Sequence, residues 1–278
     1  MTSVSHEQAP FPVTVVTVTF NDEEGLQRTV ASLRAQTLRN FEHVVVDGGS
    51  VDGSMAWLAA NPSVESSVVV SELDRGIYDA MNKGLARARG SLVTFLNAGD
   101  VYAADDVLDR AVAHQQRHGW EWGHGLARVV DGEGRAVRPL SKPKYAWRRH
   151  AFGRNTIVHQ TVFVLTDRLR EIGGFDLDYP IAADFRSVLQ LGRRSRPGLW
   201  PEVDVAFLVG GLSDRRPGRS LWDMHRARCD VLGLRGPLVG VDAMWAGGLT
   251  CYVYGRRTAK SVARLVGGQR VVNWWARQ

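Results

Sequence analysis

The chain has 278 residues, of which 44% are hydrophobic and 23% are charged. It is therefore long and apolar enough to bury a core, which excludes a disordered or low-complexity protein. Its formal net charge is +6, but residues 251–278 alone hold six basic residues and no acidic one, so the rest of the chain is balanced. Because a nucleic-acid-binding domain carries a basic face on the fold itself, this distribution argues against a nucleic-acid partner.

Cysteine occurs only at Cys229 and Cys251, which cannot form a disulfide framework, and no CxxC pair is available for zinc. This usage indicates a reducing compartment, and we expect a cytoplasmic protein. The sequence has no uncharged apolar run of about 18 residues, which a transmembrane helix would require. Residues 1–10 show neither the basic nor the apolar region of a secretory signal.

The first 117 residues alternate between predicted strands and predicted helices. Apolar runs rich in valine predict strands over 13–20, 43–46, 66–70 and 91–96. The helices that follow them are expected after Asn21, at 52–58, at 77–89 and at 107–117, and Gly90 is expected to end the third. This alternation predicts an open, parallel α/β sheet with helices on both faces.

Beyond residue 120 the pattern loosens, although further elements are recognisable. Residues 157–164 and 203–209 predict strands, and residues 167–173 and 181–191 predict helices. We therefore expect three parts, which are a flexible tail over 1–11, an α/β domain over 12–214 and a basic helical extension over 215–278.

Polar residues stand just after the predicted strands, at Asn21, Asp47, Asp74 and Asp100. Ligands of open α/β sheets bind at the carboxyl ends of the strands, so these side chains are candidates for a site. The nearby acids that we interpret instead as helix caps are Asp22, Asp52 and Asp105. The sequence lacks GxxxxGK[ST], GxGxxG, HExxH and GxSxG, which argues against a P-loop enzyme and a typical dinucleotide dehydrogenase.

Five ordered motifs resemble those of the family 2 glycosyltransferases of the GT-A fold, a Rossmann-like, mostly parallel sheet with flanking helices. They are VTVVTVTFND (13–22), FEHVVVDGGSVDGS (41–54), DRGIYDAMNKG (74–84), GSLVTFLNAGD (90–100) and the later HQ and AAD segments. The resemblance is strongest to bacterial members that build surface polysaccharides and glycolipids. It implies a nucleotide-binding half over 12–102 and an acceptor half over 103–214, and it does not extend to 215–278.

The resemblance implies an inverting hexosyl- or deoxyhexosyltransferase that takes its sugar from a nucleotide-diphosphate donor. UDP is the family's usual nucleotide, and GDP or dTDP would suit a glycolipid builder. Matching the motifs implies that the nucleotide and donor are bound by Thr19, Phe20, Asn21, Asp47, Asp74, Arg75, Asp79, Asn82, Lys83 and Asn97. Asp79, Asn82 and Lys83 are spaced to share one helix face, although Lys83 could equally be a solvated surface lysine. Many members carry a second acid where this chain has Gly48.

A divalent cation, Mg²⁺ or Mn²⁺, is the implied cofactor, and Asp100 is its implied ligand. Members usually show Asp-x-Asp at this place, whereas this chain has Asn97-Ala98-Gly99-Asp100. One protein carboxylate together with donor phosphates and waters is still a normal Mg²⁺ arrangement. We interpret the literal DxD at 176–178 as part of a turn.

Asp184 matches the family's catalytic acid and is the predicted general base for the acceptor hydroxyl, with Asp178 in reserve. The alternative for Asp184 is an acid at a helix N-terminus that is favoured by the helix dipole. His159 and Gln160 are predicted to lie on a strand that faces the site. They join Arg154 and Ser213 as candidates for contact with phosphate or acceptor.

Two other functions stay open at this stage. A nucleotidyltransferase has a similar sheet and similar metal acids, but it would need a basic, Gly-rich phosphate loop where residues 21–24 are acidic. A non-catalytic sugar-binding or scaffold protein of the same fold would tolerate the missing Asp-x-Asp.

A glycan or glycolipid is the expected acceptor. The basic and aromatic residues of 251–278 predict peripheral contact with an anionic membrane surface, the inner face of the plasma membrane. They are equally consistent with a terminal helix packed on the core.

Overall fold

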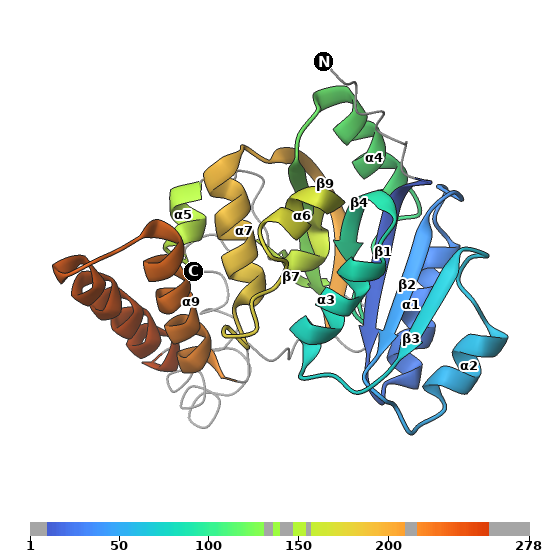
Figure 1. Ribbon diagram of the computed structural model, residues 1–278, viewed down its shortest axis with the longest axis horizontal. Coiled ribbons are helices and arrows are strands. Elements are labelled where there is room, and N and C mark those ends of the chain that lie inside the picture. The colour runs from blue at the N-terminus through green and yellow to red at the C-terminus, as the bar shows by residue number, and fades with distance from the viewer. Residues whose placement is uncertain (1–9, 131–135, 140–146, 154–156, 209–215, 256–278) are drawn as a thin grey trace, which may run out of the picture. The chain divides into compact units, whose positions relative to one another are not determined.

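The computed structural model describes residues 10–130, 136–139, 147–153, 157–208 and 216–255 (Figure 1). The chain divides into two compact units, Met1–Val209 and Gly210–Gln278. The first unit contains one mixed sheet with its flanking helices, and the second is helical throughout most of its described residues.

The first long strands along the chain form the parallel half of the sheet. They are β1 (Phe11–Thr19), β2 (Glu42–Asp47), β3 (Ser67–Ser71) and β4 (Gly90–Phe95), in the spatial order β3-β2-β1-β4. β2 is buried along its whole length and β1 along most of it, which explains why their sequences are apolar without alternation. Thr19 is in register with Asp47, and Asp47 with Ser71, so these three strands end together.

The other half of the sheet mixes strand directions. β8 (Val162–Leu165) runs antiparallel to β4 and to β6 (Trp122–Val130), whereas β9 (Gly198–Leu208) runs parallel to β6. Two short strands, β5 (Val101–Tyr102) and β7 (Ala136–Pro139), pair with β9 and β6. The sheet is therefore mostly but not entirely parallel.

Helices cover both faces of the sheet, as predicted (Figure 1). α3 (Ile77–Arg87) packs on the face that bears Val16, so closely that a Cβ on Gly84 would lie 2.3 Å from Val16 Cγ1. α1 (Glu23–Arg34) and α4 (Val107–His118) contribute to one core cluster with Val13 and Val15. Because alternate residues of a strand point to opposite faces, this cluster lies on the other side of β1. The remaining helices of this unit are α2 (Ser54–Ala60), α5 (Trp147–Ala151), α6 (Thr166–Glu171) and α7 (Ala183–Arg194).

Several predicted boundaries are wrong; the strand expected over 203–209, for example, begins at Gly198. Gly90 does not end α3 but begins β4, where a Cβ would lie 2.4 Å from the backbone nitrogen of Thr14, so the close approach of β1 explains this glycine. His159 and Gln160 do not lie on a strand but in a short 3-10 turn, His159–Thr161. The Thr161 N–H closes that turn by donating to the Val158 carbonyl at 3.0 Å, and β8 begins only after it.

The second unit is described over residues 216–255. α9 (Pro217–Leu232) begins with proline in its first turn and ends at Gly233, whose φ of 65° is the left-handed conformation that glycine adopts most readily. Residues 237–255 form a further helix. None of the helices described in either unit is long and apolar enough to cross a membrane. Residues 256–278, which make up most of the predicted membrane-contacting segment, lie outside the described residues.

Candidate active site

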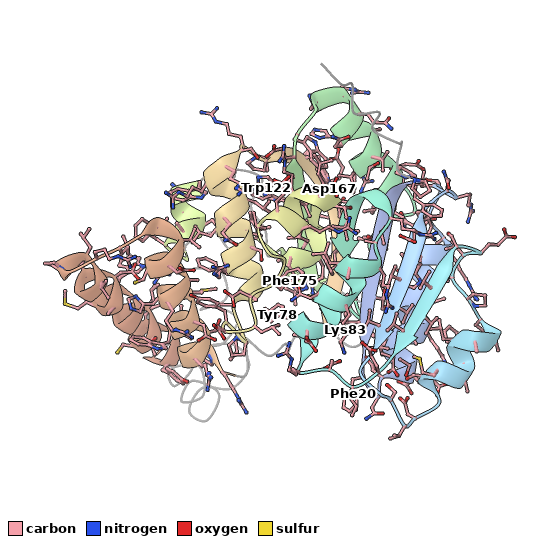
Figure 2. The ribbon with its side chains drawn as sticks, in the orientation of Figure 1. Phe20, Tyr78, Lys83, Trp122, Asp167 and Phe175 are labelled. Atoms are coloured by element: carbon pink, nitrogen blue, oxygen red, sulfur yellow. The ribbon has the colours of Figure 1, made fainter. Side chains whose placement is uncertain are left out.

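The carboxyl ends of the parallel strands form the edge at which the predicted residues gather. Phe20 lies just beyond β1 at this edge, whereas Trp122, the first residue of β6, lies at the opposite end of the sheet (Figure 2). Backbone hydrogen bonds join the turns after the strands, because Gly48 N–H donates to the Thr19 carbonyl and Ala98 N–H to the Val18 carbonyl, each at 3.0 Å. The turns after β1, β2 and β4 are therefore neighbours.

Asp47 is buried, and its carboxylate is held by its own loop. It accepts hydrogen bonds from the backbone N–H groups of Gly49 and Ser50, at 3.3 and 3.1 Å. It also accepts from the hydroxyls of Ser50 and Ser71, the latter at 2.6 Å. These donors occupy the lone-pair positions at which a carboxylate accepts hydrogen bonds. Asp47 thus fixes the shape of the turn after β2, and its contact with the nucleotide stays a prediction.

The turn after β1 is fixed by hydrogen bonds to the loop that follows β2. Asn21 has a φ of 48°, the left-handed region in which asparagine is tolerated better than most residues. Its N–H donates to Ser50 Oγ at 2.8 Å, and its Oδ1 accepts from the Val51 N–H at 2.9 Å. This arrangement presents Phe20 with 61% of its surface exposed, next to Thr19, whose buried Oγ1 has no hydrogen-bond partner among the described residues. An exposed ring of this kind suits a ligand with a flat apolar face.

Asp74 occupies the space beside Gly48, where many family members carry their second acid. A Cβ on Gly48 would lie 2.6 Å from Asp74 Oδ2 and 3.3 Å from Phe20 Cδ2. Asp74 is held in place because its Oδ1 accepts from the Gly76 N–H at 2.8 Å. A carboxylate therefore stands next to the turn after β2 although residue 48 is glycine.

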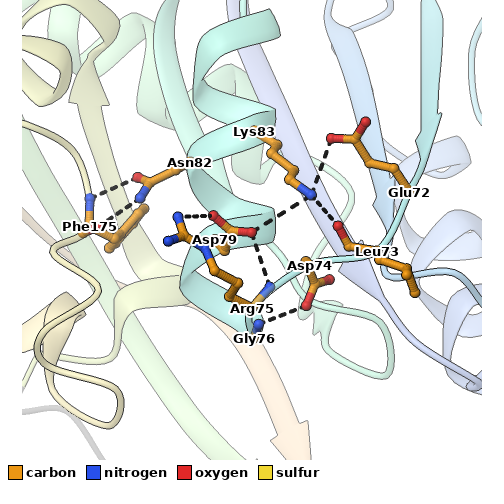
Figure 3. Close-up of polar contacts among 9 residues, drawn as sticks. All are labelled: Glu72, Leu73, Asp74, Arg75, Gly76, Asp79, Asn82, Lys83 and Phe175. Carbon is orange, nitrogen blue, oxygen red and sulfur yellow. Dashed lines mark hydrogen bonds and ion pairs between the residues drawn. The ribbon is translucent and has the colours of Figure 1, made fainter.

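The loop before α3 is anchored by two residues of that helix (Figure 3). Lys83 Nζ donates to the Leu73 carbonyl at 2.7 Å and lies 3.1 Å from Glu72 Oε1. Asp79 accepts from the Arg75 backbone N–H at 3.0 Å and from its guanidinium at 3.1 Å. The backbone hydrogen bond from Arg75 is the main reason why the pKa of Asp79 lies below its usual value. Lys83 is 23% exposed and engaged on three sides, so it is an anchor rather than a solvated surface lysine.

Asn82 reaches a different partner, so the three residues predicted to share one helix face do not act together. Its Nδ2 donates to the Phe175 carbonyl at 2.7 Å, and its Oδ1 accepts from the Phe175 N–H at 2.9 Å (Figure 3). Tyr78, one turn earlier, stacks on the Phe175 ring with centroids 5.7 Å apart (Figure 2). The Tyr78 hydroxyl donates to Asp184 Oδ1 at 2.8 Å. Tyr78 was not among the predicted site residues, although it lies inside the GIYDAMNKG motif, four residues before Asn82.

Asp184 lies in the first turn of α7 and is 26% exposed. Besides Tyr78, it faces His159, whose Nδ1 lies 3.4 Å from Asp184 Oδ2. The other ring nitrogen of His159, Nε2, lies 3.3 Å from Asn97 Nδ2. Because an amide nitrogen only donates, Nε2 accepts, and the neutral ring then carries its proton on Nδ1, directed at Asp184. His159 thus connects the turn after β4 to Asp184.

The pKa of Asp184 lies below its usual range. Burial raises the pKa, but the hydrogen bonds that Asp184 accepts from His159 and from the Tyr78 hydroxyl are among the contacts that lower it by more. The group is therefore ionised at neutral pH. An ionised carboxylate with two fixed partners and partial exposure can accept a proton from a ligand.

Asp100 lies at the end of the turn after β4, and Thr29 of α1 fixes this turn. Thr29 Oγ1 donates to the Asp100 carbonyl at 2.8 Å and accepts from the Gly99 N–H at 3.0 Å. Asp100 Oδ2 accepts from Gln160 Nε2 at 2.8 Å. Burial raises the pKa of Asp100 to about 6, although the Gln160 hydrogen bond lowers it. Asn97 Oδ1 is buried and accepts no hydrogen bond from the described part of the chain.

The structure brings together most of the residues predicted for the site. The contacts form one series, in which Asp184 faces His159, His159 contacts Asn97, the Asn97 carbonyl accepts from the Asp100 N–H, and Asp100 accepts from Gln160. The residues predicted at the nucleotide end surround the neighbouring turns. The predicted candidates Arg154 and Ser213 lie outside the described residues.

The literal DxD at 176–178 forms a turn, as interpreted from the sequence. Asp176 Oδ1 accepts from the Asp178 N–H at 3.0 Å, and Asp176 Oδ2 lies 3.5 Å from Arg186 Nε. Asp176 is thus held by its own turn and by Arg186 of α7. Asp178, the reserve candidate for the base, is exposed.

Comparison with known proteins places the chain among glycosyltransferases. The model of a family described as glycosyl transferase family 2 matches residues 14–167. An uncharacterized glycosyltransferase of Mycobacterium tuberculosis H37Rv is 38% identical over 220 residues, which cover 77% of this chain and 82% of the relative. A PGL/p-HBAD biosynthesis glycosyltransferase of Mycobacterium bovis BCG is 31% identical over 176 residues, 62% of this chain and 66% of the relative.

A solved structure supports the fold independently. The mannosyltransferase PcManGT from Pyrobaculum calidifontis, in complex with GDP-Man and Mn²⁺, superposes with a TM-score of 0.62. The match covers 98% of this chain and 81% of that chain, at 20% sequence identity. At this identity the likeness concerns the fold alone, and it confirms the predicted α/β architecture with its flanking helices.

Proposed function

The chain belongs to glycosyl transferase family 2, and we propose that it transfers a sugar, with inversion, from a nucleotide-diphosphate donor to a glycan or lipid-linked acceptor. The observation that carries the proposal is Asp184, an ionised and partly exposed carboxylate held by Tyr78 and His159. It stands one side chain away from the turn that bears Asn97, at the carboxyl ends of the strands.

Asp184 acts as the general base in this reaction. It takes the proton of the acceptor hydroxyl, whose oxygen then attacks the anomeric carbon from the face opposite the leaving group. The bond from that carbon to the diphosphate oxygen breaks, and the nucleoside diphosphate leaves with the electron pair. One displacement of this kind inverts the configuration. Tyr78 and His159 keep the carboxylate oriented, so they are positioning residues.

The nucleotide end of the donor lies over the turns after β1 and β2. Phe20 offers an exposed ring, Thr19 a buried hydroxyl without a partner among the described residues, and Asp74 a carboxylate fixed beside Gly48. PcManGT was solved with GDP-Man, which agrees with a nucleotide-sugar donor for this fold. The proposal includes UDP, GDP and dTDP sugars as candidates.

The residues of the turn after β4 fit a divalent cation. Asn97 Oδ1 is a buried oxygen without a donor among the described residues, and Asp100 is a carboxylate whose burial raises its pKa to about 6. Oxygen ligands of this kind suit Mg²⁺ or Mn²⁺, and the PcManGT structure holds Mn²⁺. When bound, the cation would stabilise the charge that develops on the departing diphosphate. Gln160 keeps Asp100 in place through the bond to Oδ2.

The test begins with a thermal-shift panel of UDP, GDP and dTDP, each with Mg²⁺ or Mn²⁺, because a ligand that binds the folded state raises Tm. Transfer from the matching donor sugars is then measured for Asp184→Asn and for the matched control Asp178→Asn. We expect Asp184→Asn to retain nucleotide binding and lose transfer by a factor of about 10³ or more, and Asp178→Asn to remain active. Full transfer by Asp184→Asn would refute the assignment of the base. No response to any nucleotide would refute the donor class.

A further inference from the structure

An open groove lies at the end of the sheet opposite the candidate active site. Its volume is about 540 Å³, which is within the range of sites for small molecules. Its lining comes from two segments, which are the end of α4 with the residues that follow it and the segment 195–199 between α7 and β9. Trp122, which is labelled in Figure 2, begins β6 directly after the lining residues 119–121. The lining residues are all different from those of the candidate active site.

Tightly packed aromatic rings form the base of this groove. Trp120 stacks on Trp200 with ring centroids 5.9 Å apart, and the His114 ring lies 5.2 Å from that of Trp200. Two glycines leave space for the indoles. A Cβ on Gly198 would lie 2.3 Å from Trp120 Cδ1, and a Cβ on Gly123 would lie 3.0 Å from Trp200 Cζ3. The rings therefore have little room to rearrange.

The same packing fixes the tautomer of His114. Trp120 Nε1 donates to His114 Nδ1 at 2.8 Å. Because an indole nitrogen only donates, Nδ1 accepts, and the neutral ring carries its proton on Nε2. Burial, together with the charges of His118 and Arg117, lowers the pKa of His114, so the ring stays neutral. His114 thus lines the groove as a hydrogen-bond donor and has no free nitrogen for a metal ion.

Other polar groups of the groove are either available to a ligand or already neutralised. Ser195 Oγ is buried and has no hydrogen-bond partner in the described part of the chain. His118 is exposed, and its ring centroid lies 4.4 Å from that of His114. Glu121 is paired, since its Oε1 lies 2.9 Å from Arg168 Nε. The groove therefore offers hydrogen-bonding groups and little free negative charge.

The charges around the groove argue against an ionic ligand. α4 and α7 both end next to lining residues, and the unpaired carbonyls of a helix C-terminus carry partial negative charge, which disfavours an anion. A cation would be repelled by Arg196, which is exposed at the groove. A neutral ligand with hydroxyls can instead both donate and accept here. Leu199, which is 37% exposed, adds an apolar contact. Hydroxyls around an apolar C–H face are the chemistry of a sugar ring.

We propose that this groove is a second saccharide site, which binds a neutral glycan unit at the end of the sheet opposite the site of transfer. The C–H face of the sugar packs on Leu199 and on the imidazole rings, and its hydroxyls bond to His114 and Ser195. The groove can bind a glycan whether or not Asp184 is the base, so the two proposals can fail separately.

The experiment follows the histidine ring protons of the full chain by NMR while methyl glycosides of glucose, galactose, mannose and rhamnose are added. The chain has eight histidines, and His114→Gln and His118→Gln identify the two signals of the groove. We expect at least one glycoside to shift both signals saturably, whereas the signals of the buried His43 and His124 stay in place. A shift at His159 alone would place the sugar in the candidate active site and would overturn the proposal.

Substitutions and a second probe test the contacts and the class of ligand. Leu199→Ser removes the apolar contact and should weaken glycoside binding about fivefold or more. The matched control is Leu238→Ser, at a leucine of the second unit that is 59% exposed, and it should bind like the parent chain. Inorganic phosphate at constant pH should leave the groove signals unchanged. The proposal is overturned if no glycoside shifts them, if the two leucine variants bind equally, or if phosphate saturates the groove, because the ligand would then be an anion.

Discussion

Replacing Tyr78 with phenylalanine separates the orientation of the proposed base from its ionisation. The substitution removes the hydroxyl that donates to Asp184 Oδ1 at 2.8 Å and keeps the ring that stacks on Phe175. A hydrogen bond to a charged group contributes about 1.5–3 kcal/mol. Because each 1.36 kcal/mol is a factor of ten in rate, the loss should reduce kcat about tenfold or more. The stack remains, so Tm should change little.

The pH dependence of kcat shows in which direction Tyr78→Phe changes the pKa of Asp184. The Tyr78 hydrogen bond lowers the pKa of Asp184, so Tyr78→Phe raises it, and the acid limb of the kcat profile moves to higher pH. At pH 7 the carboxylate is ionised in both proteins, so the rate difference there reports orientation. The control is Tyr254→Phe, which removes the hydroxyl of an exposed tyrosine in the second unit. An unchanged kcat at pH 7 together with an unmoved acid limb would refute the role given to Tyr78.

Three further substitutions test other parts of the arrangement. Lys83→Met should raise the donor KM roughly tenfold with little change in kcat, because it releases the loop before α3. Initial rates at varied donor concentration measure both constants. A change confined to kcat would contradict the role given to Lys83. Gly48→Ala places a Cβ 2.6 Å from Asp74 Oδ2 and should weaken nucleotide binding in the thermal-shift assay. If the nucleotide raises the Tm of the variant as much as that of the parent protein, Asp74 does not bind the nucleotide. Gly84→Ala places a Cβ 2.3 Å from Val16 Cγ1 and should lower stability by about 1–3 kcal/mol; denaturant unfolding measures this, and a neutral result would mean that α3 can move off the sheet.

The parallel half of the sheet could be predicted from the sequence because its strands are buried on both faces. β2 is buried at every position, so its valines form an uninterrupted apolar run that has no helical period. β6 could not be found in this way, since glycine, histidine and arginine interrupt its nine residues. Its place in the sheet follows from pairing with β8 and β9, which lie later in the chain. Contacts between strands so far apart along the chain leave no periodic signal in the sequence.

Candidate site residues could be named from the sequence, but their hydrogen-bond partners could not. The motif around α3 contains the candidates Asn82 and Lys83, yet Asn82 bonds to Phe175, 93 residues away. No spacing rule within a helix contains that information. Similarly, Gly48 signalled a missing acid, and only the structure shows that Asp74 fills the adjacent space.

α3 serves both ends of the site through two pairs of residues, each four positions apart. Asp79 and Lys83 hold the loop at the proposed nucleotide end, whereas Tyr78 and Asn82 hold Phe175 and Asp184 at the proposed reacting end. Because residues four apart share a helix face, and the two pairs are offset by one residue, they point in directions about 100° apart. The helix itself is pressed onto β1, so neither pair can shift without the other. This geometry explains why we expect changes at Lys83 to appear in the donor KM and changes at Tyr78 to appear in kcat, although the two side chains lie on the same three turns of helix.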